Sequence, residues 1–126
     1  MRKVIFTKDA PAPIGPYSQA IFADNTLYVS GQIALDPKTG ELLTSEIGME
    51  THRVLDNVKA ILTAAEMNFS NVVKCSVFVK DIGQFAAINA VYSSYFSDSN
   101  APARELVEVA ALPKGVNVEI SCIAHK

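Results

Sequence analysis

Residues 45–80 read SEIGMETHRVLDNVKAILTAAEMNFSNVVKCSVFVK, and the spacing of the apolar residues changes once within this segment. At first they recur every three or four positions, which predicts a helix from Ser45 or Glu46 to about Met67, with Glu50 away from its apolar face. From residue 72 to residue 80 apolar and polar residues alternate, which predicts a strand. One face of that strand is expected to carry Val73, Cys75, Val77 and Val79.

Three further strands are expected before this helix. A short apolar run at residues 4–6 predicts the first, and the segment 9–16 contains three prolines and one glycine, which excludes regular structure. Residues 18–23 and 26–32 are strand-like and flank Asp24-Asn25. Because Asp and Asn tolerate a positive φ angle, this pair predicts a two-residue hairpin.

A second helix and two strands are expected after residue 80. Asp81 and Gln84 resemble a capping box, and Pro102 prevents the helix from continuing. The last strands are expected at residues 105–110 and 116–124, joined by residues 112–115, LPKG, whose pattern is typical of a type I turn. The buried stripe of the second helix is expected to comprise Phe85, Ile88, Tyr92 and either Tyr95 or Phe96.

The resulting order, βββαβαββ, predicts an α+β fold in which two helices cover one face of a single sheet, within one domain spanning residues 1–126. Several strands nevertheless carry large apolar residues on both faces, at residues 27–29, 77–79 and 106–107. An uncovered face of this kind would be a larger apolar patch than a monomer usually exposes. The sequence therefore predicts a homo-oligomer that buries the second face.

Composition and charge exclude several classes of protein. The 126 residues are 49% apolar and 19% charged with a net charge of −2, and the 11 basic residues are scattered, so a nucleic-acid partner is not expected. No apolar stretch approaches the roughly 18 residues that span a membrane, and no export signal opens the chain. Cys75 and Cys122 lie in apolar strands and are expected to be free, buried thiols of a cytoplasmic protein. No spacing of Cys and His suggests a metal site.

Two charged residues could carry chemistry. Arg104 begins a strand and offers a planar fork suited to a carboxylate, although a surface ion pair with Glu105 or Glu108 is the more common role of such a residue. Glu119 lies on the face opposite the apolar set of the last strand, where it could act as a general base on water or simply face solvent. The same face is expected to carry Asn117, Ser121 and Ile123.

Four other residues are weaker candidates for binding a ligand. Tyr17 follows the rigid Gly15-Pro16 turn, and it could equally be a packing residue. Ser30-Gly31 ends an apolar strand, where the glycine would let a ligand approach the backbone or would mark a bulge. Asn89 follows a core position of the second helix, where a solvated side chain is the more common outcome.

Taken in order, five segments resemble the Rid (YjgF-like) family, and the RidA group most closely. They are IGPYSQA (14–20), VSGQIALDPKTGE (29–41), DNVKAIL (56–62), VKCSVFVKDI (73–82) and PARELVEVAALPKGVNVEI (102–120). The resemblance covers essentially the whole chain. It implies a chorismate-mutase-like fold and a homotrimer with clefts between subunits.

The resemblance also implies a function. It points to hydrolysis of 2-iminopropanoate and 2-iminobutanoate to 2-keto acids and ammonia, with no metal or cofactor. Arg104 would hold the substrate carboxylate and Glu119 would position or activate the water. Tyr17, Ser30, Gly31, Asn89 and Leu106 would line the cleft. Two alternatives stay open: a non-catalytic regulatory trimer that binds 2-keto acids, and a translation-inhibiting endoribonuclease.

Two departures from the family pattern concern the site. The family usually has PARSCVEV where this chain has PARELVEV, so Leu106 replaces a cysteine and Glu105 a serine. The segment before Pro102 is shorter than usual and lacks the common phenylalanine next to the proline. A thiol role at position 106 would put activity in doubt, and the shorter segment could widen the cleft or alter its substrate range.

Overall fold

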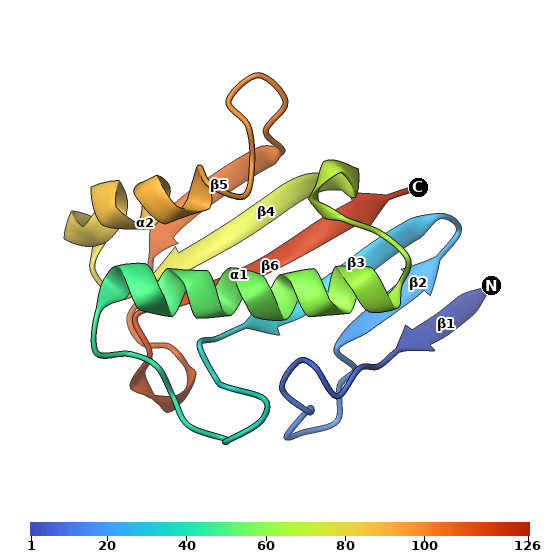
Figure 1. Cartoon of the computed structure of the whole chain (residues 1–126), viewed down its shortest axis with the longest axis horizontal. Coiled ribbons are helices and arrows are strands. Elements are labelled where there is room, and N and C mark those ends of the chain that lie inside the picture. The colour runs from blue at the N-terminus through green and yellow to red at the C-terminus, as the bar shows by residue number, and fades with distance from the viewer.

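The computed structural model describes residues 1–126 and shows one six-stranded mixed sheet with two helices (Figure 1). The spatial order of the strands is β1-β2-β3-β6-β4-β5, and every neighbouring pair is antiparallel except β4 and β5. The elements follow the expected βββαβαββ order along the chain. They are β1 (Arg2–Ile5), β2 (Ala20–Ala23), β3 (Thr26–Gln32), α1 (Ile47–Ala64), β4 (Val72–Val79), α2 (Phe85–Tyr92), β5 (Ala103–Glu108) and β6 (Val118–His125).

Both predicted turns form, but one has a different geometry. Asp24 and Asn25 have φ angles of 49° and 68°, as the two-residue hairpin between β2 and β3 requires. In the turn at residues 112–115, the backbone N–H of Gly115 donates to the carbonyl of Leu112, and Lys114 has a φ angle of 57°. A type I turn needs a negative φ angle at that third position, so the type I prediction was wrong.

The core lies between the sheet and the helix layer. Alternate residues of β6 are buried on that side, and so are Cys75, Val77 and Val79 of β4. Val73 was expected among them, but half of its surface is exposed and Val72 is buried instead. The cause is a register shift between β4 and β6 at residues 72–74, which moves the alternation by one position.

The helices are shorter than the sequence indicates. α1 begins after Glu46, whose carboxylate accepts from the backbone N–H groups of Gly48 and Met49. α2 buries Ile88 and Tyr92 as expected, but Phe85 at its start is 44% exposed and is not part of the core. Neither helix has the length and apolar character needed to cross a membrane.

A buried carboxylate joins α1 to the start of β6. Glu50 is completely buried, contrary to its expected place on the polar side of the helix. Its two oxygens accept from the backbone N–H of Asn117 at 2.7 Å, from the Asn117 side-chain amide at 2.8 Å and from the backbone N–H of Val118 at 3.3 Å. Asn117 therefore turns its side chain to Glu50 and not to the open face, because the strand begins only at Val118.

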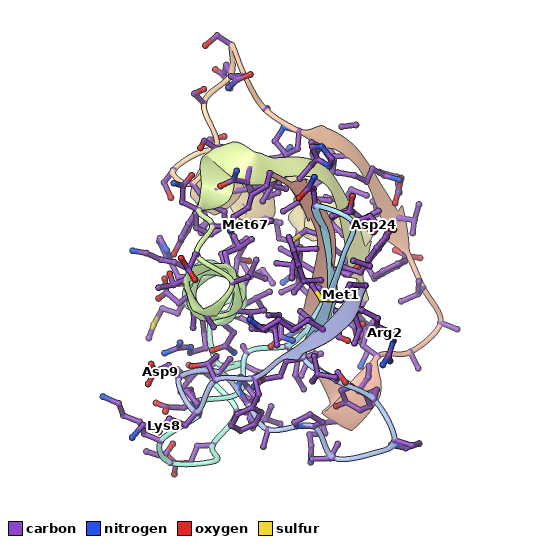
Figure 2. The ribbon with its side chains drawn as sticks, turned by 90° about the vertical axis from the view of Figure 1, so that its right-hand side faces the viewer. Met1, Arg2, Lys8, Asp9, Asp24 and Met67 are labelled. Atoms are coloured by element: carbon purple, nitrogen blue, oxygen red, sulfur yellow. The ribbon has the colours of Figure 1, made fainter.

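The other face of the sheet carries no helix. Figure 2 shows α1 end-on, on one side of the sheet only. On the opposite side Tyr28, Val73 and Val107 expose 51%, 50% and 41% of their surface. The predicted second apolar face is therefore present in this chain.

Replacing Glu50 with Ala is expected to lower the free energy of unfolding by about 3 kcal/mol, because it leaves buried backbone donors without an acceptor. Urea denaturation at one fixed protein concentration would measure the change. Glu41→Ala is the matched control, since Glu41 is exposed and its carboxylate has no hydrogen-bond partner. A loss for Glu50→Ala no larger than that of the control would contradict the assignment.

Candidate functional site

The predicted site residues divide into two groups on opposite faces of the sheet. Arg104 of β5 lies in register with Cys75 of β4, and Cys75 is buried on the helix side. Glu119 of β6 lies in register with Phe78, on the open side. Because side chains alternate between the faces of a strand, one copy of the chain cannot bring these two charged groups together.

Arg104 is held by α2. Its Nη1 donates to Oδ1 of Asn89 at 2.7 Å, and its guanidinium lies 4.7 Å from the ring centroid of Tyr92 and 5.9 Å from that of Phe85. The Asn89 hydrogen bond and the cation–π contact with Tyr92 hold the guanidinium in place. This hydrogen bond uses one donor of the five, so the rest of the fork is available to a carboxylate.

The ion-pair alternative for Arg104 does not form. Glu105 instead pairs with Lys74, at 3.1 Å, and accepts from the Ser76 hydroxyl, and these partners lower the pKa of its carboxyl group. Glu108 accepts from the backbone N–H of Ile82 at 2.9 Å. Both neighbouring carboxylates are therefore engaged elsewhere.

A pocket of about 290 Å³ opens beside Arg104, between the end of α2 and the segment that leads into β5. We call it the Tyr92 pocket. Leu106 lies on the same face of β5 as Arg104 and packs partly buried against the core, so its side chain serves as support for that strand. The Tyr92 pocket is lined by Asn89, Tyr92, Ser93, Phe96, Asp98, Ala101, Pro102 and Arg104.

Gly31 makes room for Glu119. A β-carbon built on Gly31 would lie 2.0 Å from Oε2 and 2.8 Å from Cδ of Glu119. Both distances are shorter than the contacts that β-carbons make in proteins. The strands meet here at a bulge, since Ser30 and Gly31 of β3 together oppose the single residue Ser121 of β6. The bulge predicted at this glycine is confirmed, and the group that lies close to it is the Glu119 carboxyl group; the approach of a ligand stays a prediction.

Glu119 has no hydrogen-bond donor and no cation as a partner within the chain. Partial burial therefore raises the pKa of its carboxyl group above the ordinary value, because desolvation disfavours the charged form. A carboxyl group with a raised pKa accepts and returns a proton more readily near neutral pH.

Tyr17 and Ser30 lie on the Glu119 side. The Ser30 hydroxyl donates to the carbonyl of Ser18 at 2.6 Å, and the Tyr17 hydroxyl accepts from the backbone N–H of Ile14 at 3.4 Å. Half of the Tyr17 side chain is exposed. A cleft of about 380 Å³, which we call the Glu119 cleft, is lined by Ile14, Tyr17, Ser30, Gly31, Ile33, Pro113, Lys114 and Glu119.

Two residues that shape this cleft were not predicted from the sequence. Gln19 is buried, and its amide group donates to the carbonyls of Thr7, Ala10 and Pro11 and accepts from the backbone N–H of Thr7. It thereby fixes the loop that leads to Tyr17. Lys114 is the one cation that lines the Glu119 cleft, and its left-handed backbone costs about 1–2 kcal/mol. The available signal for Gln19 was a polar residue within the strand expected at residues 18–23. The available signal for Lys114 was its position just before the turn glycine Gly115.

The chain presents no group of three or more His, Cys, Asp and Glu side chains that could hold a metal ion. Cys75 and Cys122 face each other across β4 and β6 as free, buried thiols, and burial raises the pKa of both. Thiols with a raised pKa are poor nucleophiles at neutral pH. The polar groups at the two pockets include the Arg104 guanidinium, the Glu119 carboxyl group, the Lys114 ammonium and the hydroxyls of Tyr17 and Ser30.

The comparisons with known proteins agree with this architecture. The model of the endoribonuclease L-PSP family matches residues 7–126. A RutC family protein of Pyrococcus horikoshii is 53% identical over 126 residues, covering 100% of this chain and 99% of the relative. A bovine (Bos taurus) protein named 2-iminobutanoate/2-iminopropanoate deaminase is 49% identical over 124 residues, covering 98% of this chain and 90% of the relative.

Solved structures show the same fold. YyfA from Yersinia pestis, a protein of unknown function of the conserved Rid family, superposes with a TM-score of 0.97 at 44% identity and covers 100% of both chains. TdcF of E. coli with bound serine superposes with a TM-score of 0.93 at 40% identity and covers 98% of both chains. The chain thus belongs to the Rid family, also called the YjgF-like or endoribonuclease L-PSP family.

The raised pKa of Glu119 predicts how the free energy of unfolding depends on pH. The folded protein holds this proton more tightly than the unfolded chain, so the carboxyl group destabilises the fold as the pH rises through its folded pKa. Glu119→Gln should therefore unfold at higher urea than the wild type at about pH 8, with the difference vanishing near pH 4. Glu41→Gln, at an exposed position, is the control. A wild type that is the more stable protein at about pH 8 would contradict this pKa assignment.

Proposed function

We propose that this protein hydrolyses reactive 2-imino acids, such as 2-iminopropanoate and 2-iminobutanoate, to 2-keto acids and ammonia, at clefts between the subunits of a homotrimer. The observation that supports this most is the arrangement of Arg104 and Glu119, which lie at two open pockets on opposite faces of the sheet. The carboxyl group of Glu119 has no hydrogen-bond partner within the chain, and Arg104 uses only one of its donors. The membership of named deaminases in the family agrees with it.

The separation of the two groups requires a second copy of the chain. In the proposed assembly the open face of one subunit, with Glu119, Tyr17 and Ser30, meets the Arg104 edge of its neighbour. Burying Tyr28, Val73 and Val107 would stabilise the assembly by removing apolar surface from water. Assembly and completion of the site would then be the same event.

Arg104 would bind the carboxylate that every 2-imino acid carries. The free donors of its fork match the two carboxylate oxygens, and the hydrogen bond to Asn89 keeps the guanidinium from swinging away. Serine bound to the related TdcF is a 2-amino acid with the same carboxylate. With the substrate carboxylate bound to Arg104, the C=N carbon would lie in a fixed position relative to Glu119 of the neighbouring subunit.

Glu119 would act on the water. As a carboxylate it takes a proton from water while the oxygen adds to the C=N carbon, and it then returns that proton to the nitrogen, which gives a tetrahedral carbinolamine. In the second step the carboxylate takes the hydroxyl proton and passes it to the nitrogen, the C=O bond forms, and the C–N bond breaks with its electron pair leaving on ammonia. One water is consumed, and one 2-keto acid and one ammonia are released.

The reaction needs little more than these two groups, because imines already react with water unaided. Positioning and one proton-transfer partner can contribute several kcal/mol without a covalent nucleophile. The hydroxyls of Tyr17 and Ser30 would line the path of the water. Neither histidine lies in the Glu119 cleft or the Tyr92 pocket, so the paired histidines of many ribonucleases have no counterpart at this site.

Arg104→Ala is expected to lower kcat/KM for 2-iminobutanoate by roughly 100-fold or more, because the carboxylate loses its charged partner. The imine can be generated in the cuvette by an amino acid oxidase, and its loss followed by competition with semicarbazide. Arg104→Lys keeps the charge without the fork and should fall between the two proteins.

Three results would point away from deamination. Equal rates of imine loss with the wild type, with Arg104→Ala and with buffer would show that the protein does not catalyse imine hydrolysis. Binding of a 2-keto acid that depends on Arg104, without turnover, would favour a regulatory trimer. RNA cleavage that survives in Arg104→Ala would favour an endoribonuclease.

A mixing experiment tests the composite cleft. Arg104→Ala and Glu119→Gln proteins should each be nearly inactive, but after joint unfolding and refolding at equal amounts about a quarter of all clefts would combine an intact Arg104 with an intact Glu119. Activity should therefore reappear at about that fraction of the wild-type value. Mixing two samples of the same variant is the control, and no recovery in the mixed sample would exclude a site shared between copies.

A further inference from the structure

We propose that the Tyr92 pocket receives the side chain of the substrate and selects 2-imino acids with large apolar side chains, aromatic or branched. The inference rests on the proposed function, since it takes Arg104 as the ligand of the substrate carboxylate. Arg104 and Asn89 belong both to the carboxylate site and to the wall of this pocket, so a molecule held by the fork lies at the pocket mouth.

Half of the eight residues that line the pocket are aromatic or apolar, namely Tyr92, Phe96, Ala101 and Pro102. The rings of Tyr92 and Phe96 lie 4.7 Å apart between centroids and are tilted by 37°, and both side chains are largely buried. Ala101 and Pro102, from the segment that leads into β5, also line the pocket. The volume of about 290 Å³ is at the lower end of small-molecule sites and is ample for one side chain.

The geometry of an imine directs the side chain to this wall. The C=N carbon is planar, and its carboxylate, its nitrogen and its side chain lie in one plane. Water attacks perpendicular to that plane, from the subunit that supplies Glu119. The side chain therefore remains beside the subunit that supplies Arg104, where the Tyr92 pocket opens.

The charges around the pocket favour an uncharged side chain. Arg104 is its one cation and is occupied by the α-carboxylate in this scheme, and Asp98 at the rim would repel a second carboxylate. A cationic side chain would lose its hydration against Tyr92 and Phe96, while Asp98, which is exposed, offers only a weak, screened attraction. Apolar side chains gain from burial against the same rings.

The test is to fill the pocket. Ala101→Phe adds a ring to the wall, and kcat/KM should fall by about 10-fold or more for the imine of phenylalanine but by less than about 2-fold for 2-iminobutanoate. An amino acid oxidase can generate both imines from phenylalanine and 2-aminobutanoate. Ser99→Phe adds the same ring to the same segment, at an exposed position outside the pocket, and should leave both values unchanged.

The outcomes separate this proposal from the function beneath it. If the wild type hydrolyses neither imine, the proposed function is wrong and the pocket assignment falls with it. If the wild type hydrolyses both and Ala101→Phe changes both equally, or neither, the pocket does not hold the side chain while the function stands. If Ala101→Phe does not fold, as judged by circular dichroism, Ala101→Leu adds a smaller side chain to the same wall. It should then lower kcat/KM for the imine of phenylalanine selectively, and an equal effect on both imines would contradict the proposal.

Discussion

The alternation of side chains along β6 is the constraint on which the rest of this structure depends. β6 lies between β3 and β4 near the middle of the sheet, and it buries Val118, Ile120, Cys122 and Ala124 against the helix layer. With the period of two, Glu119 must then lie on the other face. The position of this carboxyl group is thus a consequence of the packing of the core. Gly31 completes it, because a β-carbon at that position would overlap the Glu119 carboxyl group where it now lies.

A one-residue slip of β6 would exchange its two faces, bringing Glu119 into the core and Ile120 to the open side. Glu50 opposes such a slip, since its buried carboxylate accepts from the backbone of Asn117 and Val118 at the first residues of the strand. The carboxylate gains two backbone donors and an amide, and these hydrogen bonds offset its loss of hydration. This contact between α1 and β6 therefore adds to the core packing that sets the register of β6 and the position of Glu119.

Periodicity was enough to predict the elements and their order, because the apolar spacing of residues 45–80 and the Asp24-Asn25 hairpin are local signals. It misplaced Val73 because a register shift depends on the partner strand, and it misplaced Phe85 because exposure depends on what packs nearby. Arg104 and Glu119 were found as candidates by their residue type and by the family resemblance. Their separation by the sheet follows from the pairing of β5 with β4 and of β6 with β4, which no local pattern contains. Gln19 and Lys114 escaped notice because their importance comes from loops folded against them.

The candidate site is also where the chain departs from the rules that stabilise the rest of it. The carboxylate of Glu105 on β5, by comparison, has Lys74 and Ser76 as partners. Glu119 is partly buried without one, and Lys114 holds a strained backbone at the rim of its cleft. Groups left unpaired in this way lower stability, and they are retained where an interaction with something outside the chain needs them. Because Arg104 and Glu119 lie on opposite faces of the sheet, neither can be the partner of the other within one copy, and the proposed shared cleft rests on this separation.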